Sequence, residues 1–279
     1  MIKDNGDEKM KRIVLILTVL VLSISLIGCQ GTASEDNKEI VVGVSFFPMK
    51  DILLLIEDDL KEEGYDLRIE EFGDYQTPNN LLKDKELDAN MIQHDYFLQS
   101  FNNSNDADLK TIQPLYHATF ALYSKNYKTL EEIPNGLSIT VPDDATNFSR
   151  ALYLLGQSGL LTFKDNKTID LTVDDIESNP KDLKFDDQVP LTSLAQRYSE
   201  TEIAIMYPTY AKSLELVGDE QRLYVEKQDS VTEGYAISLV SRDDNKDSEK
   251  IKVLMKHITS DKVRQFLINE YSWASSPAF

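Results

Sequence analysis

Cysteine is almost absent from this 279-residue chain, in which Cys29 is the only one. A single cysteine excludes an internal disulfide bond. Basic residues are also scarce, because 29 Lys and Arg stand against 48 Asp and Glu, for a formal net charge of −19. This balance argues against a nucleic-acid partner and against a polybasic attachment to anionic lipid.

Recognisable catalytic motifs are missing as well. The sequence has no G-x-S-x-G nucleophile elbow, no phosphate-binding G-x-x-x-x-G-K-[ST] loop and no G-x-G-x-x-G. Its histidines, His94, His117 and His257, lie far apart and form no H-E-x-x-H motif. Adjacent acidic residues, as at 143–144 and 186–187, are typical of solvated turns. The sequence therefore predicts a binding protein without a cofactor and not an enzyme.

Long hydrophobic runs are absent except at the N-terminus. Basic residues precede the apolar segment 13–27, and Gly28-Cys29 follows it. This order is typical of a secretory signal, and the run is short for a transmembrane helix. Leu26-Ile27-Gly28-Cys29 resembles the bacterial lipobox, which implies a signal peptide at 1–28 and lipidation of Cys29. We therefore expect a lipid anchor on the extracytoplasmic face of a bacterial cell membrane; an uncleaved signal anchor is the alternative.

The mature chain would be strongly acidic. Cleavage before Cys29 removes four basic and three acidic residues and leaves a net charge of −20. Residues 29–39 would then be the lipidated cysteine and a polar tether. The remaining residues, about 240, are enough for one large domain or two lobes. In so acidic a chain, an anionic group of a ligand must be recognised locally.

From residue 40 onward, apolar runs typical of strands alternate with amphipathic helical segments. Short links between them favour a mostly parallel sheet covered on both faces. Two such series predict two lobes, 40–123 plus 235–279 and 124–234, with a ligand between them at the C-terminal ends of the strands. The predicted strands lie at 40–46, 67–72, 88–93, 115–124, 137–141, 183–185, 202–206 and 235–240. The main predicted helices lie at 48–63, 94–101, 127–133, 146–158, 191–198, 208–216, 247–259 and 261–271, and a further short helix begins at 78.

The stretch 141–150 is a strand–turn–helix step. Asp144 or Thr146 can cap the helix, whose first N–H groups attract an anion. Arg150, one turn in, adds a planar cation suited to a carboxylate. The simpler interpretation is an ordinary connection with a surface arginine.

Six segments carry a family resemblance: 72–79, 86–94, 143–152, 177–184, 227–230 and 277–279. In these segments the chain resembles the NlpA-type lipoproteins, the methionine-binding subunits of bacterial ABC importers. The resemblance spans residues 40–279. It implies an α/β chain with the type II periplasmic-binding-protein fold, in which two lobes close on one small ligand.

The resemblance also implies a ligand site. Arg150 matches the arginine of a T-N-x-x-R segment that binds the ligand carboxylate, and Asn147 belongs to the same segment. Tyr75 matches the tyrosine of D-Y-x-x-P-N, and His94 matches the histidine of F-Q-H-x-x-Y. Two aromatic positions that enclose the thioether in the family are altered: Ile92 stands in place of phenylalanine and Phe97 in place of tyrosine.

Two further positions depart from the family pattern. The asparagines that hold the polar end of the ligand are replaced by Tyr207 and Gly234. A buried ammonium group is costly without hydrogen bonds, which argues against the usual pose. Gly234 would open volume there unless Tyr207 refills it, so a short peptide or an N-acylated amino acid is an alternative ligand.

We predict a lipid-anchored solute-binding protein that takes methionine, a related amino acid or a small peptide through its carboxylate. Its partners would be an ABC permease and the ATPase of that permease. Two other classes remain: a metal-binding lipoprotein that uses His94 and His117, and a ligand-free surface lipoprotein serving adhesion or signalling. Simpler roles also remain for Tyr75, as a turn residue, and for His94, as a helix cap.

Overall fold

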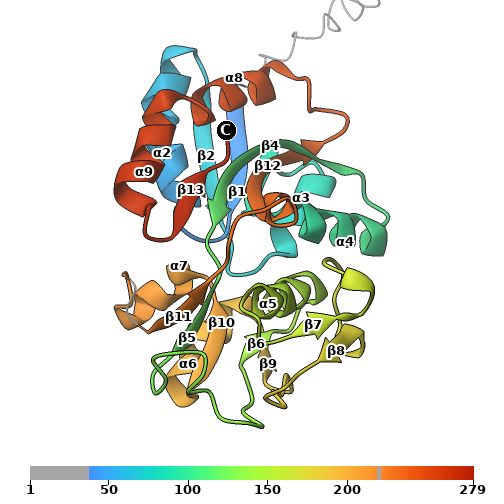
Figure 1. Cartoon of the computed structure of the whole chain (residues 1–279). Helices are drawn as coiled ribbons and strands as arrows, with labels where there is room; N and C mark the ends of the chain where they lie inside the picture. The colour runs from blue at the N-terminus through green and yellow to red at the C-terminus, as the bar shows by residue number, and fades with distance from the viewer. Residues whose placement is uncertain (1–37, 219–220) are drawn as a thin grey trace, which may run out of the picture. The chain divides into compact units, whose positions relative to one another are not determined.

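The computed structural model describes residues 38–218 and 221–279 (Figure 1). The predicted signal peptide, Cys29 and nearly all of the tether lie outside these residues. Residues Glu39–Phe279 form one unit, and the ribbon of this unit divides into two lobes (Figure 1). Within the described part of the chain, no helix is long and apolar enough to cross a membrane.

The first lobe contains a six-stranded sheet with the order β13-β4-β12-β3-β1-β2. β1 runs parallel to β2 and β3, whereas β12 runs antiparallel to β3 and β4. The prediction of a mostly parallel sheet is therefore wrong for this half, because β12 returns from the second lobe and inserts between β3 and β4. The strands are β1 (Glu39–Val44), β2 (Asp66–Glu71), β3 (Ala89–Gln93), β4 (Leu109–Ala118), β12 (Ala236–Arg242) and β13 (Ser275–Pro277).

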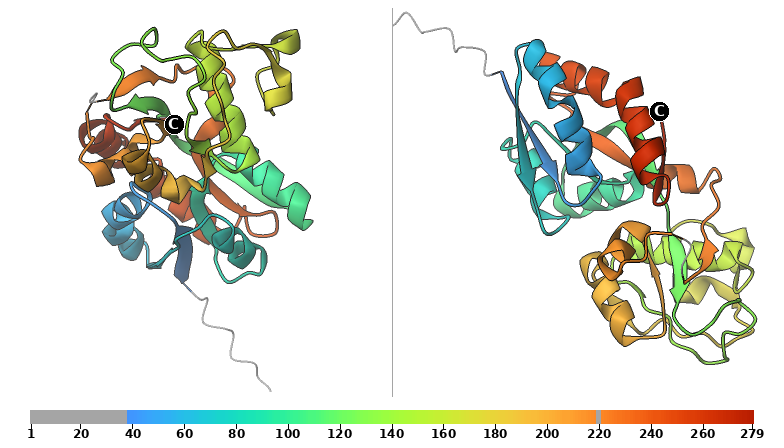
Figure 2. Two further views of the ribbon diagram at one scale, coloured as in Figure 1. Left: turned by 90° about the horizontal axis from the view of Figure 1, so that it is seen from below. Right: turned by 90° about the vertical axis from the view of Figure 1, so that its left-hand side faces the viewer.

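Helices cover both faces of this sheet, as predicted (Figures 1 and 2). β1 explains why, since its alternate side chains point to opposite faces. Ile40 and Val42 belong to one core cluster, together with apolar residues of α2, α8 and α9. Val41 belongs to another cluster, with apolar residues of α3 and α4. The helices are α2 (Met49–Glu62), α3 (Thr77–Lys83), α4 (Asp95–Asn105), α8 (Glu249–Ile258) and α9 (Asp261–Tyr271).

The second lobe is built on an antiparallel three-stranded sheet with the order β10-β5-β11. Two short pairs flank it, β6 with β9 and β7 with β8. Its strands are β5 (Ala121–Ser124), β6 (Val141–Pro142), β7 (Thr162–Phe163), β8 (Ile176–Ser178), β9 (Gln188–Val189), β10 (Ile203–Met206) and β11 (Arg222–Val225). Its α-helices are α5 (Ala145–Gln157), α6 (Leu194–Glu200) and α7 (Pro208–Ala211), and 3₁₀ turns lie at Lys164–Asn166, Val173–Asp175, Leu191–Ser193, Lys212–Leu214 and Thr232–Tyr235.

Two predicted elements of this lobe are wrong. The apolar segment 183–185 forms no strand, and Lys184 makes only an isolated bridge to Ser138. The segment 127–133 forms turns instead of a helix. Both segments are short, so local pattern alone could not outweigh the tertiary contacts around them.

The chain crosses between the lobes twice (Figure 2). β5 pairs with β10 and β11, so residues 121–123 go with the second lobe and not with residues 40–123. β12 begins at Ala236 and pairs within the first lobe. We propose crossings at residues 119–120 and 235–236, close to the boundaries expected from the sequence.

A buried amide cluster fixes α3 to β3, between the turns that carry Tyr75 and His94. Asn79 Nδ2 donates to Gln93 Oε1 at 2.7 Å. Asn79 Oδ1 accepts from Gln93 Nε2 at 2.6 Å and from Asn90 Nδ2 at 2.8 Å. All three side chains are buried, so each lost partner leaves an unsatisfied polar group.

Replacing Asn79 should therefore be costly. We expect Asn79→Ala to lower the free energy of unfolding by about 2–4 kcal/mol, because Gln93 and Asn90 lose their partner. Urea unfolding measures this change. Asn80→Ala is the matched control, since Asn80 is the next residue of α3 and is exposed. Equal losses in the two variants would contradict a structural role for the cluster.

Candidate functional site

A small cavity lies where strands of both lobes end. Phe46 follows β1, His94 follows β3 and Tyr207 follows β10, as predicted for a site at the C-terminal ends of strands. The cavity has a volume of ≈ 10 Å³, which is room for about one water molecule. Six of the predicted site residues line it, Tyr75, Ile92, His94, Phe97, Asn147 and Tyr207, together with Phe46, Gln93, Leu191 and Ile237.

Arg150 does not line the cavity but forms a buried ion pair. Its side chain is 2% exposed and that of Glu226 is 5% exposed. Nε donates to Glu226 Oε1 at 2.8 Å and Nη2 donates to Oε2 at 2.5 Å, a bidentate arrangement. Nη2 also donates to the carbonyl oxygen of Ala118 at 2.9 Å. Burial would lower the pKa of Arg150, but the Glu226 carboxylate outweighs burial and raises this pKa, so the guanidinium stays charged.

Aromatic rings surround the same guanidinium. Its central carbon lies 5.0 Å from the ring centroid of Phe120, 5.3 Å from that of Tyr207 and 4.6 Å from that of Tyr235. These distances are typical of cation–π contacts. The interpretation of Arg150 as a surface arginine is therefore wrong.

The N-terminus of α5 is occupied by the chain's own carboxylate. Asp144 caps the helix, as predicted, and its Oδ1 accepts from the backbone N–H of Asn147 at 2.9 Å. Both Asp144 oxygens also accept from Asn147 Nδ2 at 3.1 Å. Burial raises the pKa of Asp144 in spite of these hydrogen bonds. The expected anion position at this helix end thus already holds an acidic side chain.

Tyr207 joins Arg150 to Asn147. Its hydroxyl accepts from Arg150 Nη1 at 3.0 Å and donates to Asn147 Oδ1 at 2.7 Å. Burial raises the pKa of Tyr207 to about 12, although the nearby charge of Arg150 opposes this rise. The phenol therefore remains protonated at neutral pH.

His94 both caps α4 and faces the cavity. Its Nδ1 accepts from the backbone N–H of Phe97 at 3.2 Å, so the helix-cap interpretation is confirmed. Nε2 then carries the proton and lies 3.4 Å from Asn147 Oδ1. Burial lowers the pKa of His94 to about 3, and the charge of Arg150 lowers it further. His94 is therefore a neutral donor at physiological pH.

Tyr75 reaches across to the second lobe. Its hydroxyl contacts that of Tyr210, which lies within α7. Its ring packs edge-on against Phe46 and Phe97, with centroid distances of 5.8 and 6.2 Å. Tyr75 therefore does more than pack within its own turn.

The volume predicted beside Gly234 is absent. A Cβ atom at this position would lie 2.5 Å from ring atoms of Tyr96. The Tyr96 hydroxyl donates to the carbonyl oxygen of Val231 at 3.3 Å, and its ring packs 4.6 Å from that of Tyr235. The prediction is wrong because a large ring from α4 takes the space. Gly234 itself does not line the cavity.

Sequence reasoning missed several residues of this network. Glu226 directly precedes the segment 227–230, so a search for an internal partner of Arg150 could have started there. Tyr96 and Tyr210 gave no signal, because their roles depend on contacts that only the fold creates.

The metal-binding alternative has no support in the residues that the structure describes. Among 38–218 and 221–279, no group of three or more His, Cys, Asp or Glu could hold a metal ion. His117 lies on β4, where its backbone pairs with Ala236 and Ser276.

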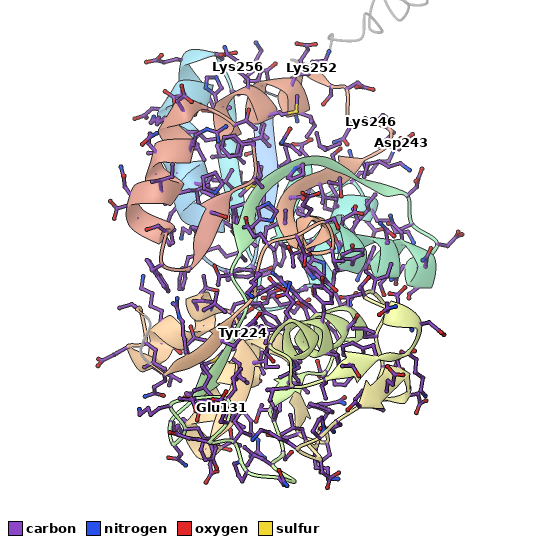
Figure 3. The ribbon with its side chains drawn as sticks, viewed as in Figure 1. Glu131, Tyr224, Asp243, Lys246, Lys252 and Lys256 are labelled. Carbon is purple, nitrogen blue, oxygen red and sulfur yellow. The ribbon has the colours of Figure 1, made fainter. Side chains whose placement is uncertain are left out.

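Most ion pairs lie at the surface, away from the cavity. Figure 3 labels Asp243 and Lys246, whose charged atoms are 2.7 Å apart, and Lys252 on α8, which lies 2.8 Å from Glu249. Exposed pairs of this kind contribute about 0–1 kcal/mol each. Among the ion pairs of the described residues, only Arg150–Glu226 has both side chains no more than 5% exposed.

Comparison with known proteins finds similarity along the whole unit. Residues 40–279 match the family model of the NlpA lipoproteins. The methionine-binding lipoprotein MetQ of Bacillus subtilis is 33% identical, over 96% of this chain and 99% of that protein. The D-methionine-binding lipoprotein MetQ of Escherichia coli K12 is 31% identical, over 88% and 89%. A nutrient-binding protein from Burkholderia cenocepacia, solved bound to methionine, has a TM-score of 0.79 at 29% identity, over 86% of this chain and 100% of that chain.

The low pKa of His94 predicts a dependence of stability on pH. In the unfolded chain His94 binds a proton near pH 6.5, whereas in the folded chain it stays neutral down to about pH 3. Wild-type stability should therefore fall with decreasing pH between these values, by up to about 1.4 kcal/mol per pH unit from this residue.

His94→Asn should remove this contribution while keeping a side chain that can cap α4. Denaturant unfolding of both proteins from pH 4 to pH 7 measures the difference, in which the titration of carboxylates cancels. Parallel curves for the two proteins would contradict the assignment of His94 as a buried neutral residue.

The ion pair gives a second prediction. Glu226→Gln removes the counter-charge of buried Arg150 and should cost about 3–5 kcal/mol of unfolding free energy. Glu200→Gln is the matched control, because Glu200 pairs with Arg197 at 3.1 Å but is 53% exposed. The control should lose at most about 1 kcal/mol. A loss of similar size in both variants would refute a structural role for the buried pair.

Proposed function

The chain belongs to the NlpA lipoprotein family, and we propose that it is the lipid-anchored solute-binding protein of an ABC importer. Its ligand is methionine, a related amino acid or a short peptide. The observation that carries this proposal is the family match over residues 40–279, a range that contains every residue lining the cavity. Relatives that match over most of the chain are named for methionine binding. The family consists of substrate-binding proteins, and we propose no catalytic role.

We place the ligand carboxylate at Nη1 of Arg150. Glu226 and Ala118 hold Nε and Nη2. Nη1 instead donates a hydrogen bond to the hydroxyl of Tyr207, which lines the cavity. The neutral Nε2–H of His94 is a second donor on the same side. Carboxylates accept hydrogen bonds from guanidinium groups more strongly than neutral acceptors do.

Apolar and aromatic side chains would receive the rest of the ligand. Ile92 and Phe97 line the cavity beside Phe46 and Tyr75. Such a surface suits an aliphatic or thioether side chain, since sulfur packs well against aromatic rings. Asn147 Oδ1 is an acceptor for the amino end of the ligand.

Binding requires the lobes to open, because a cavity of ≈ 10 Å³ cannot hold an amino acid. The Tyr75–Tyr210 contact joins the lobes in the form described here. We propose that opening breaks this contact, that closure on the ligand restores contacts of this kind, and that the closed form docks on the permease and its ATPase. Lipidation of Cys29 would hold the protein at the extracytoplasmic face of the membrane.

A second candidate function is a surface lipoprotein that binds no small ligand. One observation favours it: the hydrogen-bonding groups around the cavity are mostly paired with one another.

Thermal unfolding of the mature domain with added ligands separates these functions. L-Methionine, N-acetylmethionine or glycyl-methionine, at about a hundred times the dissociation constant, should add about 2.7 kcal/mol of stability. That gain should raise the melting temperature by about 5–10 °C in a chain of this size. Methionine methyl ester is the control, because it keeps the side chain and lacks the carboxylate.

The ester should give little or no shift. A shift with the ester equal to that with methionine would contradict our placement of the carboxylate. No shift with any carboxylate ligand would reject the transport function and favour the ligand-free surface protein. A shift with divalent metal ions alone would favour the metal-binding alternative.

A further inference from the structure

The hydroxyl of Tyr207 occupies the groups that a bound ligand would use. It accepts from Arg150 Nη1 at 3.0 Å and donates to Asn147 Oδ1 at 2.7 Å. A ligand carboxylate would need the first of these groups, and a ligand amino group would need the second. Tyr207 therefore makes, within the protein, hydrogen bonds that would otherwise be available for a solute.

The hydrogen bonds of Arg150 leave little capacity for a ligand. A guanidinium has five N–H groups. Nε and both N–H groups of Nη2 are engaged by Glu226 and Ala118, and one N–H of Nη1 is engaged by Tyr207. Among the residues described, the other N–H of Nη1 has no partner. An entering carboxylate could thus form one hydrogen bond with Arg150 while Tyr207 stays in place.

The ring of Tyr207 also takes up the space. The residue is 2% exposed, and its ring centroid lies 4.7 Å from that of Phe120 and 6.1 Å from that of Tyr210. The cavity beside it has only ≈ 10 Å³. Opening of the lobes alone leaves this ring bound to Arg150 and Asn147, because all three residues belong to the second lobe.

We propose that Tyr207 is a specificity-determining residue that blocks the ligand site from within. A carboxylate ligand must displace it to form more than one hydrogen bond with Arg150 and to reach Asn147 Oδ1. This proposal rests on the proposed function. A carboxylate can displace the phenol because its charge-assisted hydrogen bond to the guanidinium is stronger than that of a neutral hydroxyl. Ligands without a carboxylate have no such advantage and are rejected.

The test is isothermal titration of L-methionine into wild type, Tyr207→Asn and Tyr207→Phe. Tyr207→Asn removes the ring and should bind at least tenfold more tightly than wild type. Tyr207→Phe removes only the competing hydrogen bonds and should bind about threefold more tightly. Tyr116→Phe is the matched control, because the Tyr116 hydroxyl is buried without a hydrogen-bond partner among the described residues. It should bind within twofold of wild type.

Each outcome decides the proposal. If wild type binds and both Tyr207 variants bind as tightly as wild type or more weakly, the blocking role of Tyr207 is refuted, while the solute-binding function stands. If Tyr207→Asn binds and wild type does not, the blocking role of Tyr207 is supported and methionine is rejected as the wild-type ligand. If neither wild type nor either Tyr207 variant binds L-methionine, the blocking role of Tyr207 is refuted and methionine is rejected as the ligand, while the thermal test with the other carboxylate ligands decides the transport function. Should Tyr207→Asn not fold, as judged by circular dichroism, Tyr207→Phe decides, and an affinity equal to or below that of wild type overturns the proposal.

Discussion

The buried ion pair between Arg150 and Glu226 is the interaction on which the centre of this structure depends. It joins α5 to the end of β11, and Arg150 also donates to Ala118, the last residue of β4 before the first of the two proposed crossings. The ring of Tyr235, at the second crossing, lies against the same guanidinium. One charged side chain thus connects the second lobe with both crossings. A buried cation of this kind is tolerated only with its counter-ion, so the position of Glu226 constrains the whole region.

The sequence predicted the parts of the fold that local pattern decides. Apolar runs that alternate with amphipathic helical segments indicated a sheet covered on both faces, and Asp144 was one of the two candidate caps at the start of α5. Strand order was not predictable in this way. β12 lies between β3 and β4 because of pairing with residues more than a hundred positions earlier, and no periodicity within β12 encodes that choice.

For the site, residue types were predictable and their partners were not. Tyr75, His94 and Asn147 converge on one cavity, as the family resemblance implied. Glu226 lies 76 residues from Arg150, so their pairing is a property of the fold. The packing of Tyr96 against Gly234 is also a property of the fold. The absence of a side chain at Gly234 predicted free volume, but in the structure the ring of Tyr96 fills that space. Close packing makes a small residue a poor indicator of a cavity.

These contacts also limit how a ligand can be recognised. Both features that attract an anion, the α5 N-terminus and Arg150, are already paired with Asp144 and Glu226. A ligand carboxylate would add a third acidic group beside a single arginine, in a chain that is strongly acidic overall. Long-range attraction therefore cannot drive its binding. The stabilisation has to come from short, directed hydrogen bonds in a water-poor site, where effective dielectric screening is weak. In the binding mode that we propose, recognition depends on exchanging internal hydrogen bonds for those of the ligand, and the geometry at Nη1 of Arg150 decides which solutes bind.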